Sequence, residues 1–315
     1  MAARTGSLST AEVVRVALAG KRRTVGGMAF EAGLLVALLV ALGVLVTLVV
    51  DVLTKGWDVL TGRGIDFVTG SLSLTPETAG VWQSIVGSVV LTAFVAIVSF
   101  PIGIGAAVYL EEYAPDNRFT RFVTTNIRNL AGVPSIVYGI LGLTIFVRFI
   151  EVVGAGGGTV GKNVLAGGLT MAALVLPIMI ITASEALRAV PDSIREAGFG
   201  VGATRWEVVR SHVLPYAAPG ILTGTILTLA RAFGETAPLL LVGAVTGFFS
   251  SGNASLWTRT TGPYTALPVT IFSWTRQPDT DFRALTAAAI VVLLVVLFLA
   301  NGTAIILRNR YERKW

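Results

Sequence analysis

The sequence contains no cysteine and a single histidine, His212. Without cysteine the chain has no disulfide, no thiolate nucleophile and no cysteine-based metal site. One imidazole also falls short of the several ligands that a histidine-based metal site uses. We therefore expect no metal and no cofactor, and we expect His212 to be a packed or interfacial residue.

Charged residues are also scarce, at 13% of the chain, whereas about 25% is usual in a soluble domain. Hydrophobic residues make up 54% and the mean hydropathy is +0.77. Several apolar runs reach the roughly 20 residues that cross a bilayer. The net charge of +6 comes from cations in short loops and tails between these runs. This distribution indicates membrane topology and argues against a nucleic-acid partner.

The sequence further lacks the G-x-x-x-x-G-K-[ST] loop that cradles the phosphates of ATP, so the chain does not bind ATP by that route. The apolar runs predict an all-α membrane protein with six transmembrane helices. We place these spans at 28–53, 81–110, 130–152, 164–187, 216–248 and 284–307.

Lysine and arginine are concentrated in both tails and in the loops after the second and fourth spans. By the positive-inside rule, both termini are expected in the cytoplasm. We divide the chain into a cytoplasmic N-terminal tail with an amphipathic segment (1–27), a first span with its external loop (28–80), a core (81–308) and a cytoplasmic tail (309–315).

The cytoplasmic loop 188–215 is long for a simple connection. Pro191 signals a turn before one short helix. Thr204 and Glu207 have the spacing of a capping box at the start of a second helix. Two amphipathic helices carrying an exposed Trp206 would form a docking surface. An ordinary interfacial loop is the alternative.

Two charges, Arg231 and Glu235, lie in the apolar stretch "RAFGETAPLL". Four residues apart, they share one face of a helix, and we expect them to pair and to face the bundle interior. Gly234 would admit a neighbouring helix, and Pro238 would free a carbonyl group. The pair is either a structural staple, that is, an ion pair that holds helices together, or it places a cation, Arg231, on the route of an anion.

The loop carries Glu196, Ala197, Gly198, Gly202, Leu214 and Pro215. This spacing resembles the cytoplasmic signature Glu-Ala-Ala…Gly…Ile-x-Leu-Pro of the permease subunits of bacterial ABC importers. The sequence departs from it at Gly198, where the pattern has alanine, and at His212, where it has isoleucine. The resemblance implies that the loop is a coupling helix that seats in a separate ATPase subunit, with these residues as the coupling site.

"RAFGETAPLL" together with "LAGVPSIVYGILG" (130–142) is similar to the PstA-type permeases of the bacterial phosphate-specific ABC importer. The "TAP" of Thr236–Pro238 favours PstA over the related PstC. The resemblance implies a type I ABC importer permease fold, an inner-membrane location and no enzymatic activity of its own. It also implies that Arg231 and Glu235 belong to the translocation path.

The partners implied by this resemblance are a second, PstC-like permease, a PstB-like ATPase dimer and a PstS-like extracytoplasmic phosphate-binding protein, with membrane lipid around them. Inorganic phosphate would be the imported ion. Three alternatives stay open at this point: a permease for another oxyanion such as molybdate or sulfate, an ion-coupled secondary transporter, and a structural membrane protein that uses the ion pair as a staple.

Overall fold

The computed structural model describes residues 25–154, 161–244 and 262–311, and within these ranges every regular element is helical. The α-helices are α2 (Val25–Gly62), α3 (Gly64–Thr69), α4 (Trp82–Val108), α5 (Arg118–Ala131), α6 (Ser135–Gly142), α7 (Arg148–Val152), α8 (Val164–Arg188), α9 (Asp192–Gly200), α10 (Arg205–Val208), α11 (Leu214–Gly234), α12 (Ala237–Leu241), α14 (Leu267–Thr275) and α15 (Asp281–Tyr311). Three π-helical turns join some of them: η1 (Tyr109–Tyr113), η2 (Leu143–Val147) and η3 (Val209–Val213).

Six helical segments in the described ranges are long and apolar enough to cross a membrane. They are Val25–Gly62, Trp82–Tyr113, Ser135–Val152, Val164–Arg188, Arg205–Gly234 and Asp281–Arg310. Each overlaps one predicted span, which confirms the six-helix prediction. The first helix continues to Gly62, so the first part of the predicted external loop is helical.

The chain divides into two units, 1–51 and 52–315, according to the contacts within each. In the first unit the described residues form the beginning of α2, which is apolar on every side, as is typical of a helix surrounded by lipid. The amphipathic segment predicted within 1–27 lies almost entirely outside the described residues.

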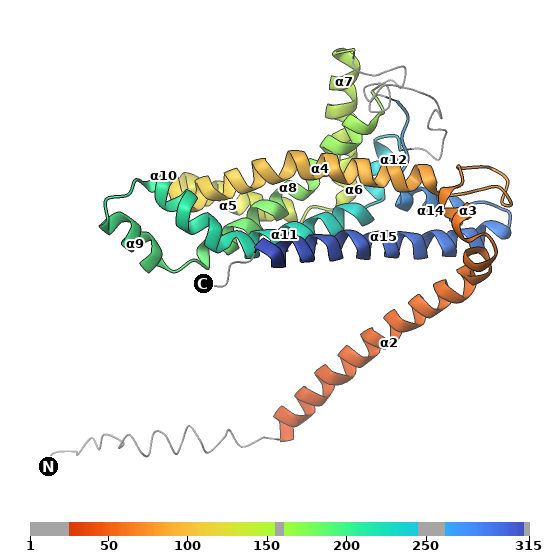
Figure 1. Cartoon of the computed structure of the whole chain (residues 1–315), viewed down its shortest axis with the longest axis horizontal. Helices are drawn as coiled ribbons and strands as arrows, with labels where there is room; N and C mark the ends of the chain where they lie inside the picture. The colour runs from red at the N-terminus through yellow and green to blue at the C-terminus, as the bar shows by residue number, and fades with distance from the viewer. Residues whose placement is uncertain (1–24, 155–160, 245–261, 312–315) are drawn as a thin grey trace. The chain divides into compact units, whose positions relative to one another are not determined.

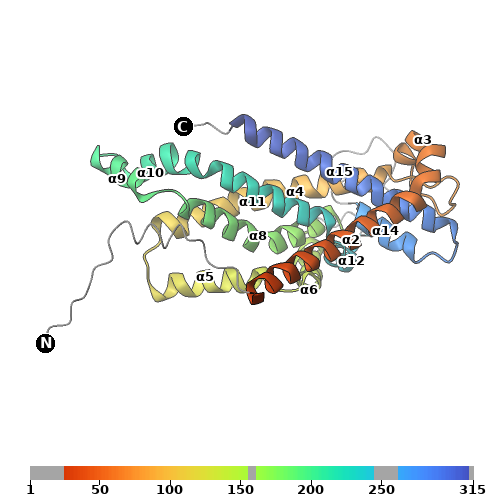
Figure 2. The ribbon, with the colours of Figure 1, turned by 90° about the horizontal axis from the view of Figure 1, so that it is seen from below.

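The second unit is built on four long helices, α4, α8, α11 and α15, which run side by side (Figures 1 and 2). Helix α8 is the most buried of them and packs on both α4 and α11. A Cβ on Gly103 would lie 2.6 Å from Met179 Cγ, and one on Gly224 would lie 2.5 Å from Thr182 Oγ1. Glycines at these contacts therefore let the helix backbones approach closely.

Two segments predicted as loops contain helices. The loop after the second span holds α5, whose first turn is capped by Asn117, with Thr120 N donating to Asn117 Oδ1 at 2.9 Å. The loop 249–283 holds α14, which is buried through residues such as Leu267 and Trp274. The sequence analysis predicted no helix in these two segments, because α5 is amphipathic rather than apolar and α14 is too short to be recognised by length.

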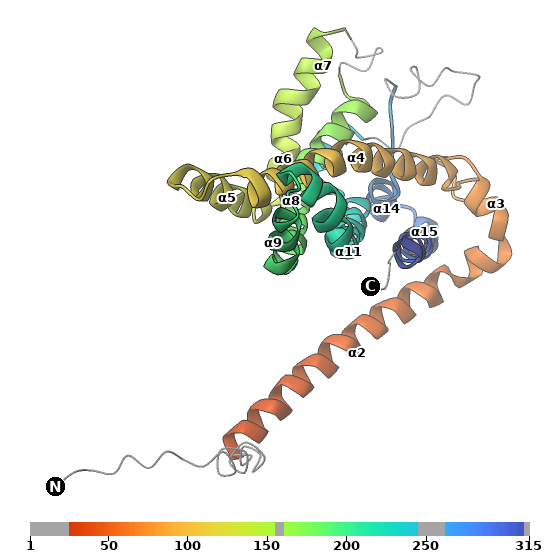
Figure 3. The same cartoon turned by 60° about the vertical axis from the view of Figure 1, so that its left-hand side comes forward.

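The third candidate span consists of α6, η2 and α7. Figures 1 and 3 show it inclined steeply to the four long helices rather than running along them. Its base is fixed by α6, which packs on α8 and α12. A Cβ on Gly142 of α6 would come within 2.1 Å of Thr170 Oγ1 in α8. This contact fixes where the third span leaves the bundle.

Candidate functional site

The fifth span is interrupted in the middle of the "RAFGETAPLL" stretch. Helix α11 ends at Gly234, Glu235 is extended with φ −76° and ψ 126°, and α12 begins at Ala237. Pro238 stands in the first turn of α12, where the missing N–H is not needed. The disruption predicted at Pro238 is therefore present within the span 216–248, because proline cannot donate to the carbonyl one turn earlier.

Arg231 and Glu235 contact each other across this break, with Arg231 Nε 3.4 Å from Glu235 Oε1. The predicted pair is thus present, although Glu235 follows the helix and does not share its face. Arg231 lies in the last turn of α11, where the negative end of the helix dipole favours a cation. The contact is long for an ion pair, and the two side chains are 48% and 18% exposed.

Arg231 does not face the interior of this chain's own bundle, contrary to expectation. It belongs to a stripe of exposed residues on α11, spaced by three and four positions: Tyr216, Gly220, Thr223, Leu227, Arg231 and Gly234. A Cβ on Gly234 would have no atom within 4 Å, so none of the described residues supplies the neighbour expected there. A guanidinium at membrane depth is costly against lipid, so this stripe requires a polar path or another subunit.

The two stretches that carried the resemblance lie against each other. Helix α12 packs on α6, and a Cβ on Gly139 would lie 2.7 Å from the Cα of Pro238. Tyr138 and Leu239 share one buried cluster, and Tyr138 Oη donates to Leu130 O at 3.0 Å. The stretch 130–142 therefore supports the helix break that positions Glu235.

Loop 188–215 folds as predicted, into two short helices, and a tight turn joins them. Gly202 has φ +83° in the turn between α9 and α10, a backbone conformation that favours glycine. Thr204 N donates to Glu207 Oε2 at 2.7 Å, and Glu207 N donates to Thr204 Oγ1 at 3.4 Å. This is the predicted capping box.

The predicted coupling residues occupy different environments in this loop. Glu196 and Ala197 are exposed on α9, beside the exposed apolar side chains of Phe199 and Val201, and Trp206 is exposed on α10. Gly198 is buried, and a Cβ there would lie 2.7 Å from Val208 Cγ2. Gly198 therefore joins α9 to α10 rather than facing a partner.

The remaining predicted residues lie at the entry to the fifth span. Leu214 is partly buried against a core cluster, whereas Pro215 and His212 are exposed. Among the described residues His212 is therefore not packed, which agrees with the interfacial alternative of the prediction. Among the described residues no group of three or more His, Cys, Asp or Glu side chains is arranged to hold a metal ion.

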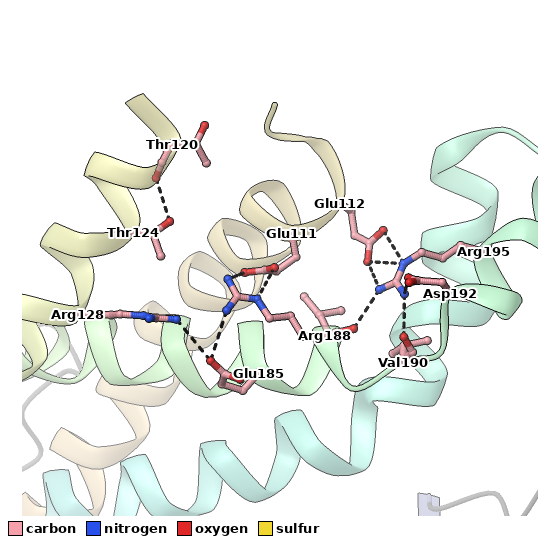
Figure 4. A network of polar contacts seen from close by, with 11 residues as sticks. Glu111, Glu112, Thr120, Thr124, Arg128, Glu185, Arg188, Val190, Asp192 and Arg195 are labelled. Atoms are coloured by element: carbon pink, nitrogen blue, oxygen red, sulfur yellow. Dashed lines mark hydrogen bonds and ion pairs between the residues drawn. The ribbon is translucent and has the colours of Figure 1, made fainter. Parts of the chain in front are cut away.

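An ion-pair network at the end of the second span was not predicted from the sequence (Figure 4). Glu111 pairs with Arg188 at 2.8 Å, and Glu112 pairs with Arg195 at 2.7 Å. Glu185 links Arg188 to Arg128, both at 3.6 Å. The available signal was the adjacent carboxylates of "YLEEY", which follow an apolar span on the same side as the loop arginines.

A cavity of about 340 Å³ adjoins this network. Its lining combines carboxylates, guanidinium groups and one aromatic ring: Glu111, Glu112, Arg188, Asp192, Arg195, Phe199 and Arg205. The lining comes from the end of the second span and from loop 188–215. The cavity therefore marks the seam between these two parts.

Comparison with known proteins shows a family match and several similar transport proteins. Residues 99–313 match the family described as binding-protein-dependent transport system inner membrane component. The chain is 34% identical over 271 residues to the phosphate transport system permease protein PstA 1 of Mycobacterium tuberculosis, covering 85% of this chain and 82% of the relative. It is 32% identical over 295 residues to the phosphate transport system permease protein PstC of Mesorhizobium japonicum, covering 87% and 88%.

A solved structure agrees in fold over nearly the whole chain. It is a bacterial alginate ABC transporter in complex with an alginate pentasaccharide-bound periplasmic protein, with a TM-score of 0.61 at 17% identity, covering 92% of this chain and 97% of that one. At this identity the match is evidence for the fold alone.

Proposed function

This chain belongs to the family of binding-protein-dependent transport system inner membrane components, and we propose that it is the permease subunit of an ATP-driven importer of inorganic phosphate. It is a multi-pass bacterial membrane protein and a transport subunit rather than an enzyme. The names of its relatives favour phosphate over molybdate or sulfate. The observation that carries the proposal is an always-charged guanidinium, Arg231, on the outward stripe of a membrane helix at the point where that helix breaks.

Arg231 is suited to a passing anion. Its planar fork of donors matches the oxygens of a tetrahedral oxyanion, and it stays charged at every physiological pH. Glu235, at 3.4 Å, competes for the same donors and keeps the anion from binding too tightly. A conduit needs such weak binding, because the ion must leave as readily as it enters.

The proposed partners are assigned to exposed surfaces of the chain. A second, PstC-like permease would face the α11 stripe, so that the path runs between the two subunits. A PstB-like ATPase dimer would receive α9 through Glu196 and Ala197, which are exposed beside apolar side chains. A PstS-like phosphate-binding protein would deliver the ion from outside, and both termini would lie in the cytoplasm.

The other coupling residues would shape this loop rather than touch the ATPase. Gly198 allows α9 to pack on α10, and Gly202 provides the turn between them. Leu214 and Pro215 open the fifth span directly behind the loop. Displacement of the loop would therefore reach α11, which carries Arg231.

Phosphate uptake tests this proposal in cells that lack their own high-affinity system and are supplied with this chain and its partner subunits. Arg231→Gln keeps the size of the side chain but removes the charge. We expect uptake to fall about 10- to 100-fold, the range for loss of one charge-assisted contact. Glu235→Gln should also lower uptake, because Arg231 would no longer be shared with Glu235 and would hold the anion too tightly to release it readily.

Arg121→Gln is the matched control, since Arg121 forms an ion pair with Asp116 on the exposed surface, away from the proposed path. Its uptake should equal that of the wild type at equal membrane level and equal ATPase association. If Arg231→Gln complexes assemble and still import phosphate at the wild-type rate, the pair is a structural staple and the path lies elsewhere.

A further inference from the structure

Three consecutive residues at the cytoplasmic end of the second span each hold one arginine of the loop region. Arg188 donates to Glu111 through Nε at 2.8 Å and through Nη2 at 2.9 Å. Arg195 donates to Glu112 through Nη2 at 2.7 Å. Arg205 lies over the ring of Tyr113, with its Cζ 5.7 Å from the ring centroid. The end of the second span is therefore tied to the end of α8, to α9 and to α10.

The pair of Glu112 and Arg195 is the most buried of these ties, with side chains 7% and 19% exposed. Arg195 also donates to Leu187 O, in the last turn of α8, at 3.0 Å and to Val190 O, just after α8, at 2.8 Å (Figure 4). One guanidinium thus joins three elements: η1, the end of α8 and α9. Arg195 has a second, weaker ion pair with Asp192, at 3.2 Å, whose side chain is 90% exposed. Loss of Arg195 would leave the Glu112 carboxylate shielded from water without its ion-pair partner, and loss of Glu112 would leave Arg195 with the exposed Asp192 alone, which is unfavourable.

The position of this pair matters because the loop has two places where it can bend. Only Ala189, Val190 and Pro191 connect α8 to α9, and Gly202 with φ +83° connects α9 to α10. Hinges are typically a few residues at the ends of elements that absorb changes in φ and ψ. The contacts of Arg195 span the connection at 189–191, whereas they do not span the turn at Gly202.

We propose that Glu112 and Arg195 form a positioning clamp that fixes α9 to the ends of α4 and α8, so that a displacement of the loop moves both spans together. Because α4 packs along α8, the clamp makes the two spans and α9 move as one rigid unit. Without it, bending at 189–191 absorbs the displacement before it reaches the membrane. This inference rests on the proposed function, since it names how that permease receives movement from its ATPase.

The test uses the complete complex in proteoliposomes, with phosphate uptake and ATP hydrolysis measured on the same sample. Glu112→Gln, Arg195→Gln and the double variant are compared. We expect each to keep hydrolysing ATP while phosphate imported per ATP falls at least about fivefold, the lower range of coupling between sites. The double variant should be no worse than Arg195→Gln, because Arg195→Gln already removes the contact that Glu112→Gln removes.

The control is Asp116→Asn, which removes a carboxylate from a similarly short pair at 2.9 Å, in which Asp116 is 78% and Arg121 is 71% exposed. Its import per ATP should be unchanged. If Glu112→Gln complexes do not assemble, phosphate imported per ATP is measured for Glu112→Asp instead, and the same fall is expected. This variant keeps the charge but has a shorter side chain, which reaches less far toward Arg195.

A second readout does not depend on phosphate. Spin labels are placed on cysteines at Tyr109, on η1, and Ser193, on α9, in a chain that has no cysteine of its own. With partner subunits freed of cysteine, the distance distribution should be narrow in wild type and Asp116→Asn and broad in Glu112→Gln. If wild type imports no phosphate but the distributions behave this way, the proposed substrate is wrong and the clamp stands. If Glu112→Gln keeps both the wild-type ratio and the narrow distribution, the clamp is overturned.

Discussion

At the scale of single residues, two buried tyrosines differ in one hydrogen bond. Tyr264 is fully buried, and its hydroxyl has no hydrogen-bond partner in the part of the chain that the structure describes. Burial also raises the pKa of this phenol, which keeps it neutral. The hydroxyl of Tyr138, by contrast, donates to Leu130 O at 3.0 Å. An unpaired buried hydroxyl is destabilising, whereas a paired one contributes to stability.

We therefore predict opposite effects for the same change at the two positions. Tyr264→Phe should leave the thermal stability of the purified complex unchanged or raise it. Tyr138→Phe should lower the stability by about 1 kcal/mol, the usual worth of one hydrogen bond. Thermal unfolding followed by fluorescence compares them directly. An equal loss in both variants would mean that Tyr264 finds a partner in the assembled complex.

The charged pair shows what sequence predicts at this scale. The contact between Arg231 and Glu235 was predictable, because a spacing of four residues keeps two side chains close even where the helix ends between them. The exposed position of Arg231 was not predictable, since it depends on which helices of the same chain cover α11. The same holds for Glu112 and Arg195, which are far apart in sequence and meet only through the fold.

At the scale of elements, the turn between α9 and α10 depends on a single backbone conformation. Gly202 has φ +83° and open space where a Cβ would be, so its replacement is limited by strain alone. Gly200 has the same open space in the last residue of α9, without a positive φ. We predict that Gly202→Ala destabilises the loop by about 1–2 kcal/mol.

Gly200→Ala should be neutral or slightly favourable, because alanine is the better helix former by up to about 1 kcal/mol. Co-purification of the ATPase with each variant measures the difference. Reduced ATPase association only in Gly202→Ala would agree with strain in the turn. Equal association in the two variants would mean that the loop tolerates another turn geometry.

The contact between α6 and α12 gives a second prediction for elements. A Cβ on Gly139 would lie 2.7 Å from Pro238 Cα, so Gly139→Ala must push the two helices apart, at a typical cost of about 1–3 kcal/mol. Because α12 follows Glu235 directly, phosphate uptake should fall with stability. Gly105→Ala in α4, where a Cβ would meet nothing within 4 Å, is the control and should keep full uptake. Full uptake in Gly139→Ala would show that this contact does not position the break.

Sequence predicted the elements unevenly, for physical reasons. Long apolar helices and the capping box were recognised, because length, hydropathy and a three-residue spacing are local signals. Helix α5 was missed because arginines and threonines mask its apolar face, although Asn117 marks its start. The break in the fifth span was anticipated as a bend at Pro238, but the extended backbone at Glu235 depends on the packing of α12 against α6.

At the scale of the whole molecule, the exposed stripe on α11 cannot face lipid along its length if it carries a charge. Leu227, one turn before Arg231, is 65% exposed in this chain, and Phe298 on α15 is 69% exposed. The two side chains are equally free by this measure, yet we expect them to have different surroundings in the complete importer. Leu227 should face the second permease or the path, and Phe298 should face lipid.

Spin labels on Leu227→Cys and Phe298→Cys distinguish these surroundings, because the chain has no other cysteine. Oxygen concentrates in the lipid interior, so its collisions with a label report contact with lipid. In the assembled complex, the label at Phe298 should collide readily with oxygen and the label at Leu227 should not. Equal oxygen accessibility at the two positions would place the stripe against lipid. Arg231 would then be exposed to hydrocarbon at a cost of several kcal/mol, and a path along α11 would have to be abandoned.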